Sequence, residues 1–230
     1  MQDDAMTAVL GCDSSRSRFT ARLAASAATL ALLTLAVLHF LRPELAPASH
    51  MISEYAVGPH GWLMGLCFGA FATSSAALFV AARSQLRTRF ACVALGFLLL
   101  AALGLSMGAV FPADPASTPH EAMSPSGRMH GVSFMIGVPS ELLTVLLLTL
   151  ALRKDARWKS LPLLTLAAVV WLSLVVMVVA LVSAAPQPGA PAHGFFGIPN
   201  RTFMIAYGAW LAVAAWPLAR AHELRSARRR

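Results

Sequence analysis

The sequence predicts an all-α integral membrane protein, a six-transmembrane-helix bundle with both termini in the cytoplasm. Of its 230 residues, 57% are hydrophobic and only 12% are charged, whereas roughly a quarter of the residues of a soluble domain are charged. Six apolar stretches are each close to the roughly 20 residues that a helix needs to cross a bilayer. Most of the basic residues lie on one side of these stretches.

The six spans are expected to follow one another through short polar connections, with no room for a separate soluble domain. Because the first 20 residues are polar and lack periodicity, we expect a disordered cytoplasmic tail over 1–20. The membrane domain then covers 21–220, and a basic cytoplasmic tail covers 221–230. The expected spans are 22–41, 61–82, 90–111, 130–152, 162–184 and 202–219.

An alternative is that the first apolar stretch is a cleaved signal peptide, because Ala46-Pro47-Ala48 resembles a cleavage site. Its apolar core is longer than that of a signal peptide, and Pro43 and Glu44 interrupt the approach to the site. We therefore expect this stretch to remain as the first span.

The distribution of basic residues predicts the orientation in a bacterial-type inner (plasma) membrane. Of the 18 Lys and Arg residues, only Arg42, Arg128 and Arg201 fall on the side opposite the termini, and the positive-inside rule places the other side in the cytoplasm. The net charge of +8 does not indicate a nucleic-acid surface, because the basic residues do not alternate with aromatic ones. The cytoplasmic set is Arg16, Arg18, Arg22, Arg83, Arg87, Arg89, Arg153, Lys154, Arg157, Lys159, Arg220, Arg225, Arg228, Arg229 and Arg230.

Small residues at intervals of four predict close helix packing. Gly61, Gly65 and Gly69 form such a row in the second span, and Gly104 and Gly108 do so in the third. Lipid supplies no hydrophobic drive for helices to associate, so close approach of backbones matters more than in water.

Titratable residues other than Lys and Arg gather on the outer side, which favours an outward-facing polar site. The alternative is the ordinary polarity of surface loops. The outer set is Glu44, His50, Glu54, His60, Asp114, His120, Glu121, His130 and His193, with His39 near the outer end of the first span.

The fourth span carries a polar stripe that descends from the outer mouth to the middle of the membrane. Glu141 lies about 16 Å below His130 at a rise of about 1.5 Å per residue, and a charged, unpaired group there costs at least ~2.5 kcal/mol. We expect Glu141 to face the bundle interior as a functional group, or alternatively to be a neutral acid bonded to Ser or Thr of a neighbouring helix. The stripe consists of His130, Ser133, Gly137, Ser140, Glu141 and Thr144.

Four short motifs occur in a characteristic order relative to the spans. They are Ile52-Ser53-Glu54-Tyr55-Ala56-Val57-Gly58, Gly108-Ala109-Val110-Phe111-Pro112-Ala113-Asp114, His130-Gly131 and Gly197-Ile198-Pro199-Asn200-Arg201. With them the chain resembles, over about residues 22–219, the bacterial and archaeal membrane family called domain of unknown function 998.

The resemblance implies a fold and a set of positions at the outer helix ends, but no reaction. Glu54 stands where family members often have Asp, and Asn200 stands where an acidic residue is common. The positions that the resemblance indicates are Ser53, Glu54, Asp114, His130 and Arg201.

The first functional hypothesis is a membrane-embedded hydrolase or lipid-modifying enzyme with Glu54, Asp114 and His130 as catalytic residues. These three, with His120 as a further ligand, are candidates to bind a divalent metal such as zinc, which would activate water. Without a metal, His130 would be a general base oriented by Asp114. The expected partners are the lipid bilayer and a lipid-like or apolar small molecule; the oligomeric state stays open.

Substrate binding is assigned to Ser53, Arg201 and Glu141, with Arg201 holding a phosphate or carboxylate head group bidentately. A second hypothesis is a transporter or receptor-like protein that uses the Glu141 stripe as a proton or solute path. A third is a haem-binding bundle with His39 and His130 as ligands, and a fourth is an accessory subunit without chemistry.

Overall fold

The computed structural model describes residues 2–115, 118–159, 161–183 and 195–220, with side chains from Ser15 onward. All regular elements in these ranges are helices, and six helices are long and apolar enough to cross a membrane. The expected all-α, six-helix fold is confirmed. The elements are α1 (Gln2–Leu41), η1 (Ile52–Ala56), α2 (Gly61–Ala82), α3 (Arg89–Val110), η2 (His120–Ala122), α4 (Pro125–Leu152), α5 (Ala156–Lys159), α6 (Leu163–Ser183) and α7 (Gly197–Ala219).

Helix α1 begins at Gln2, whereas the sequence pattern predicted a disordered segment over 1–20. The part apolar enough to cross a membrane is Ser15–Leu41. The described helix thus covers most of the predicted tail, and its apolar part begins at Ser15, before the expected start of the first span at residue 22.

The spans α4 and α7 each begin five residues earlier than expected, at Pro125 and Gly197. The start of α4 is set by Ser124, whose hydroxyl accepts a hydrogen bond from the backbone N–H of Gly127 at 3.0 Å, and by a proline in the first turn. The start of α7 is tied to the first outer connection, because the N–H of Gly197 donates to the carbonyl of Ala48 at 2.9 Å.

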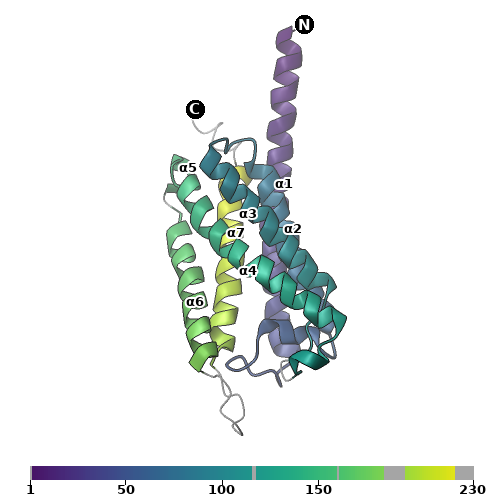
Figure 1. Cartoon of the computed structure of the whole chain (residues 1–230). Coiled ribbons are helices and arrows are strands. Elements are labelled where there is room, and N and C mark those ends of the chain that lie inside the picture. The colour runs from purple at the N-terminus through teal and green to yellow at the C-terminus, as the bar shows by residue number, and fades with distance from the viewer. Residues whose placement is uncertain (1, 116–117, 160, 184–194, 221–230) are drawn as a thin grey trace.

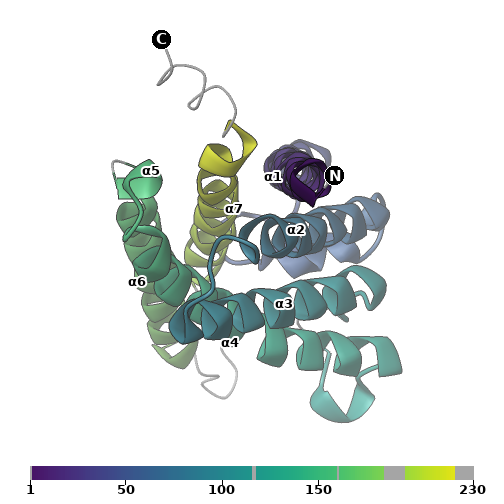
Figure 2. The ribbon, with the colours of Figure 1, turned by 90° about the horizontal axis from the view of Figure 1, so that it is seen from above.

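The helices form an arc in which α6, α7, α1, α2, α3 and α4 follow one another around the bundle (Figures 1 and 2). Helix α7 also touches α2. Helix α4 packs extensively against α3 and only sparsely against α6 and α7. The two ends of the arc therefore meet at a sparse contact between α4 and the pair α6–α7, which we call the seam of the bundle.

Glycines bring α2, α3 and α4 close together. A Cβ atom on Gly104 would lie 2.5 Å from the Cα of Gly137 in α4, and one on Gly65 would lie 3.1 Å from the carbonyl oxygen of Ala109. The predicted small-residue packing holds at these two positions. Gly61 differs, because a Cβ there would meet the carbonyl of Ala56 in η1 and not a neighbouring span.

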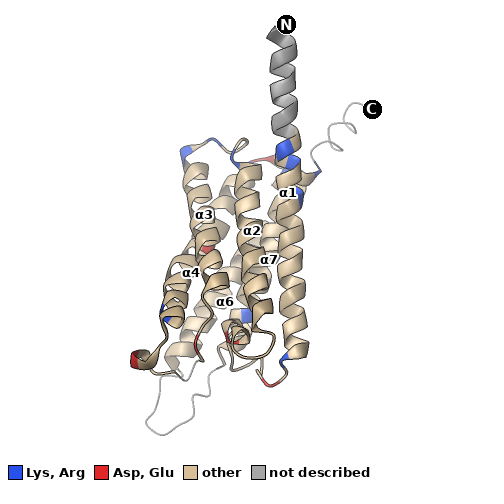
Figure 3. Ribbon diagram, turned by 90° about the vertical axis from the view of Figure 1, so that its right-hand side faces the viewer, with Lys and Arg blue, Asp and Glu red and all other residues tan. Residues whose placement is uncertain are grey.

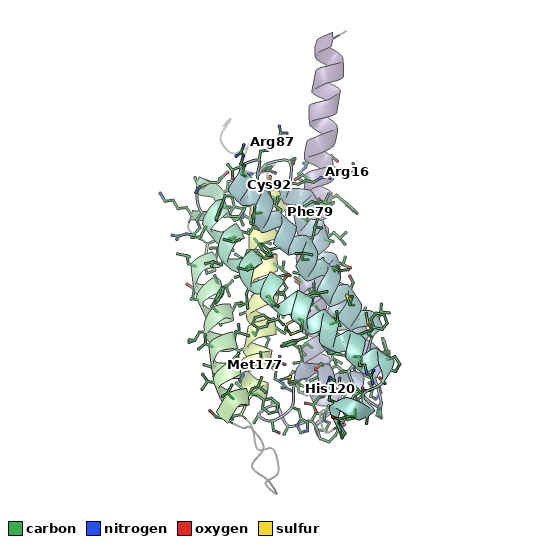
Figure 4. All side chains as sticks on the ribbon, in the orientation of Figure 1. Arg16, Phe79, Arg87, Cys92, His120 and Met177 are labelled. Atoms are coloured by element: carbon green, nitrogen blue, oxygen red, sulfur yellow. The ribbon has the colours of Figure 1, made fainter. Side chains whose placement is uncertain are left out.

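The two ends of the bundle differ in charge. Among the residues with described side chains, Lys and Arg concentrate at the end where α1 enters the bundle, and most Asp and Glu lie at the opposite end (Figure 3). Arg16 and Arg87 mark the basic end, while His120 and Met177 lie at the other (Figure 4). The expected basic tail over 221–230 and His193 lie outside the described residues.

Candidate functional site

A pocket opens between α3, α4, α6 and α7 at the end of the bundle that carries η1. Its empty volume is about 580 Å³, including the open space at its mouth. The end of the pocket nearest η1, here called its mouth, is lined by Met51, Ile52 and Ser53 and by Asn200 of α7. Most of the wall is apolar and includes Phe68, Leu105, Phe134, Met177, Phe203 and Met204.

The predicted polar stripe of α4 contributes one wall of this pocket: His130, Ser133, Gly137 and Glu141 all line it. The hydroxyl of Ser133 donates to the carbonyl of His130 at 2.6 Å, so this serine is satisfied by its own helix. Of the four residues, His130 at the mouth and Glu141 deep in the wall are therefore the two whose side chains are candidates to contact a ligand.

Glu141 is the deepest titratable residue of the pocket. The residue is 2% exposed, and its Oε2 atom has no hydrogen-bond partner in the described part of the protein. The Thr144 hydroxyl, one turn further along α4, is buried and unpartnered as well. The expectation of an acid bonded to Ser or Thr of a neighbouring helix is therefore not met at Oε2.

His130 lies in the second turn of α4 and is tied to the end of α3. Its Nδ1 is 2.9 Å from the carbonyl oxygen of Phe111, so in the neutral ring Nδ1 carries the proton and Nε2 is left as the acceptor. The ring also packs at a tilt against Phe68, with 6.0 Å between centroids. The carbonyl of Phe111 thus orients the imidazole, in the role that the sequence hypothesis gave to Asp114.

Asp114 caps the start of α4. Its two carboxylate oxygens accept hydrogen bonds from the backbone N–H and the hydroxyl of Ser124, each at 2.8 Å. A side chain at Gly127 would collide with the same carboxylate. Asp114 therefore joins the third outer helix end to the fourth and does not orient His130, which corrects the general-base arrangement expected from the sequence.

Glu54 has a similar local role, because its Oε1 accepts a hydrogen bond from the N–H of Met51 at 2.7 Å and closes the turn of η1. His120 lies in η2 and is exposed. Within the ranges that the structure describes, no three His, Cys, Asp or Glu side chains are grouped to hold a metal ion. The structure thus does not bring Glu54, Asp114, His130 and His120 together as a metal site.

Arg201 is 5% exposed and binds the first outer connection to α7. Its Nη1 donates to the carbonyls of Pro47, at 3.1 Å, and His50. Its Nη2 donates to the Tyr55 hydroxyl at 3.0 Å, and its Nε donates to Nε2 of His39 at 2.8 Å. These donors go to the protein itself, so the guanidinium is a clamp on the connection and not a free head-group site.

His39 completes this cluster. Its Nδ1 is 2.7 Å from the carbonyl oxygen of Leu35, and its Nε2 accepts from Arg201. Both ring nitrogens are therefore occupied, and neither is left to ligate a haem iron. His39 was expected near the outer end of the first span, but its partner in α7 was not foreseen.

Two residues of this region, Asn200 and Arg42, were not assigned a structural role from the sequence. The Oδ1 of Asn200 accepts a hydrogen bond from the N–H of Ile52 at 2.9 Å, which holds η1 across the mouth of the pocket. Arg42 donates to the carbonyls of Val57 and Pro59 at 2.7 and 2.9 Å. The signals in the sequence were an amide beside Arg201 and an arginine on the side that the positive-inside rule leaves poor in cations.

Six helices that are long and apolar enough to cross a membrane define a multi-pass membrane protein, which has a mostly apolar pocket between α3, α4, α6 and α7. The model of the family described as "Protein of unknown function (DUF998)" matches residues 25–217, so the chain belongs to this family. This confirms the resemblance drawn from the four motifs. Comparison with curated proteins found no match, and comparison with solved structures found none either.

Proposed function

We propose that this membrane protein binds a lipid-like or other apolar small molecule in the pocket between α3, α4, α6 and α7. The observation that carries the proposal is the lining of the pocket, which opens between four helices and presents mostly apolar side chains. Its few polar side chains are those at the mouth, His130, Ser133 and Glu141. This is the composition expected of a site that buries an apolar body and orients it through a few polar contacts.

The loose seam of the bundle supplies a route of entry from the bilayer. Helix α4 packs sparsely against α6 and α7, and Phe134 and Val138 of α4 face Met177 and Phe203 across the pocket. A molecule that enters between these helices need not leave an apolar environment. The proposal therefore includes lateral access from the membrane.

The proposed topology has both termini in the cytoplasm of a cell with a bacterial-type inner membrane. It is supported by the concentration of Lys and Arg at the end of the bundle where α1 enters (Figure 3). The pocket mouth, at the opposite end, then faces outward. Oligomerisation is compatible with this arrangement.

Binding, and not metal-assisted hydrolysis, is the function that the geometry supports best. Asp114 is engaged by Ser124 and Glu54 by the N–H of Met51, so neither is free to act on His130 as a catalytic partner in this arrangement. A hydrolytic step in the same pocket would rest on His130 alone as the base.

A proton or solute path is the second candidate function. It is favoured by the finding that His130, at the mouth, and Glu141, about 16 Å deeper at the helical rise of about 1.5 Å per residue, line the same pocket. Proton movement into proteoliposomes after a pH jump, measured with and without the apolar ligand, distinguishes this function from binding alone.

The binding proposal is tested with purified protein in lipid nanodiscs and a photoreactive dodecyl probe. Val138→Trp, which fills the pocket wall, is expected to reduce labelling of the pocket peptides by at least about tenfold, the factor for ~1.4 kcal/mol. The matched control is Val132→Trp on the same helix, at an exposed position outside the pocket. Equal labelling of both variants and the parent protein would refute the proposal.

A further inference from the structure

Among the described residues, three buried side-chain atoms have no hydrogen-bond partner: Oε2 of Glu141, the hydroxyl of Thr144 and the indole nitrogen of Trp171. Glu141 is the one carboxyl group of the three. Several other buried polar side chains do have partners in neighbouring helices: the Ser75 and Tyr207 hydroxyls lie 2.9 Å apart, and the indole of Trp210 donates to Thr149 at 2.8 Å. A membrane interior offers no solvent to replace such bonds. An unpartnered carboxyl oxygen in a pocket wall therefore indicates a partner that the protein fold does not supply.

The missing partner must donate a hydrogen bond to the carboxylate form of Glu141, whereas the protonated form can also donate one itself. No described residue forms an ion pair with Glu141; the ion pairs of this part of the chain join Arg42 to Glu44 and Arg157 to Asp155. A lone carboxylate in the membrane centre is costly, and a protonated carboxyl still has an oxygen that accepts. Hydroxyl and amine groups satisfy either form, and an ammonium also neutralises the carboxylate.

The surroundings of Glu141 allow a donor to approach it. Gly137 lies one turn nearer the mouth on the same face, and a Cβ there would lie 3.8 Å from Oε1 of Glu141. Gly104 of α3, which packs against Gly137, lines the same pocket. The absence of a side chain at Gly137 thus leaves the carboxyl group uncovered by its own helix on the side of the mouth.

We infer that the ligand of this pocket is a long-chain primary alcohol or amine, inserted with its polar end inward so that its O–H or N–H group donates to Glu141. Its apolar chain then lies against Phe134, Phe203 and Met204. This inference rests on the proposed binding function and specifies the chemical class of the ligand and its direction in the pocket.

The test uses the full chain in nanodiscs and three probes of nearly equal length: dodecanol, dodecylamine and dodecyl methyl ether. The ether keeps an oxygen but has no donor. The parent protein is expected to bind the alcohol and the amine about tenfold more tightly than the ether, the factor that one net hydrogen bond gives. Binding is measured by displacement of the photoreactive dodecyl probe.

Three variants test whether Glu141 causes the preference for the alcohol and the amine over the ether. Glu141→Leu removes the acceptor and is expected to bind all three probes alike. Glu141→Gln keeps a carbonyl acceptor without a charge, so it retains the preference for the alcohol and loses any additional preference for the amine. The control Glu121→Gln alters an exposed carboxyl outside the pocket and leaves the preference unchanged.

A second readout reports on the carboxyl group directly. Dodecanol is expected to shift a carboxyl or carboxylate stretch in the infrared difference spectrum of the parent protein, and this change is absent with the ether and in Glu141→Leu. Equal affinity for the three probes, or a preference that survives in Glu141→Leu, overturns the inference while the binding function stands. Binding of no probe, with Val138→Trp indistinguishable from the parent, overturns the binding function itself.

Discussion

Replacement of Arg201 by methionine separates a structural clamp from a ligand-binding arginine. The guanidinium of Arg201 joins α7 to α1 through His39 and to η1 through Tyr55. It also holds the carbonyls of Pro47 and His50 in the connection between them. Methionine fills a similar volume but donates to none of these acceptors.

The magnitude follows from the groups left without a donor. Each buried acceptor that loses its partner costs about 1–3 kcal/mol, although hydrogen bonds between membrane helices average only about 0.6 kcal/mol. Because His39 and Tyr55 are left without their donor inside the bundle, while the two carbonyls are partly rehydrated at its end, we expect a decrease of about 3 kcal/mol in the free energy of unfolding. For a chain of this size that corresponds to a decrease of roughly 6–12 °C in Tm.

Cys67 provides the assay. This thiol is fully buried, with its Sγ 3.4 Å from the carbonyl oxygen of Ala31, whereas Cys92 is exposed. In a Cys12→Ser, Cys92→Ser background, a thiol-reactive fluorophore therefore reports the exposure of Cys67 as the bundle unfolds on heating.

The matched control is Arg128→Met, at an exposed position on the same side of the protein. If Arg201→Met and Arg128→Met unfold within about 2 °C of each other, a difference below roughly 1 kcal/mol, the clamp is refuted. A normal Tm combined with loss of binding of a phosphate- or carboxylate-bearing lipid would instead restore the head-group role predicted from the sequence.

Three further predictions concern packing, pH and topology. Gly104→Ala is expected to destabilise the bundle by about 1–3 kcal/mol, because its Cβ would lie 2.5 Å from the Cα of Gly137; Gly96→Ala, with nothing within 4 Å of its Cβ, is the control and should be neutral or stabilising in the same thermal assay. Arg157 lowers the pKa of Asp155 chiefly through a side-chain hydrogen bond, so the stabilisation exists above the ordinary pKa and is lost as pH falls through the lowered one. Because the pair is partly exposed, Asp155→Asn should lower stability by less than about 1 kcal/mol at about pH 7 and by a smaller amount at about pH 3, measured by denaturation at both pH values. Reporter fusions should place both termini in one compartment and the connections beside η1 and η2 in the other; a shared compartment for a terminus and either connection would contradict the proposed topology.

The spans were predictable because the bilayer imposes their length and hydropathy on the sequence. The second span was expected over 61–82 and is Gly61–Ala82, and close contact at Gly104 followed from small-residue spacing. Helix starts were harder, since α4 begins where Ser124 and Pro125 set its first turn and not where hydropathy rises. A hydropathy window averages over such local hydrogen bonds and does not detect them.

The site residues were predictable as types but not by their partners. Asp114 and Glu54 were recognised as polar residues at outer helix ends, yet each bonds to backbone or hydroxyl groups a few residues away in the same connection. Hydrogen bonds at that range depend on the path of the loop, and span periodicity carries no information about it. A cluster of ionisable residues in a sequence therefore predicts an outer polar face, but not convergence on one ligand.

The exceptions to the positive-inside rule have a structural explanation. Arg42 and Arg201 lie at the end of the bundle that carries η1, and both are largely buried and donate to carbonyls of the connection between α1 and α2. Burial with several carbonyl partners removes them from the set of exposed charges on which the rule operates. These two arginines thus hold the connection between α1 and α2 in place, and their positions do not argue against the proposed topology.

Glu141 differs from all of these residues in having no structural partner for its Oε2 atom among the described residues, and this difference predicts the sign of its substitution. An unsatisfied buried polar group costs about 1–3 kcal/mol, whereas leucine has a similar volume and no polar atom to satisfy. Glu141→Leu is therefore expected to raise the Tm of the ligand-free protein by roughly 2–12 °C, in contrast to the decrease expected for Arg201→Met. The same Cys67 labelling assay measures both, with Glu121→Gln as the control for loss of a carboxylate. A protein that becomes less stable on losing this carboxyl would show that Glu141 has a structural partner, and the case for a ligand-binding carboxyl in the pocket would fail.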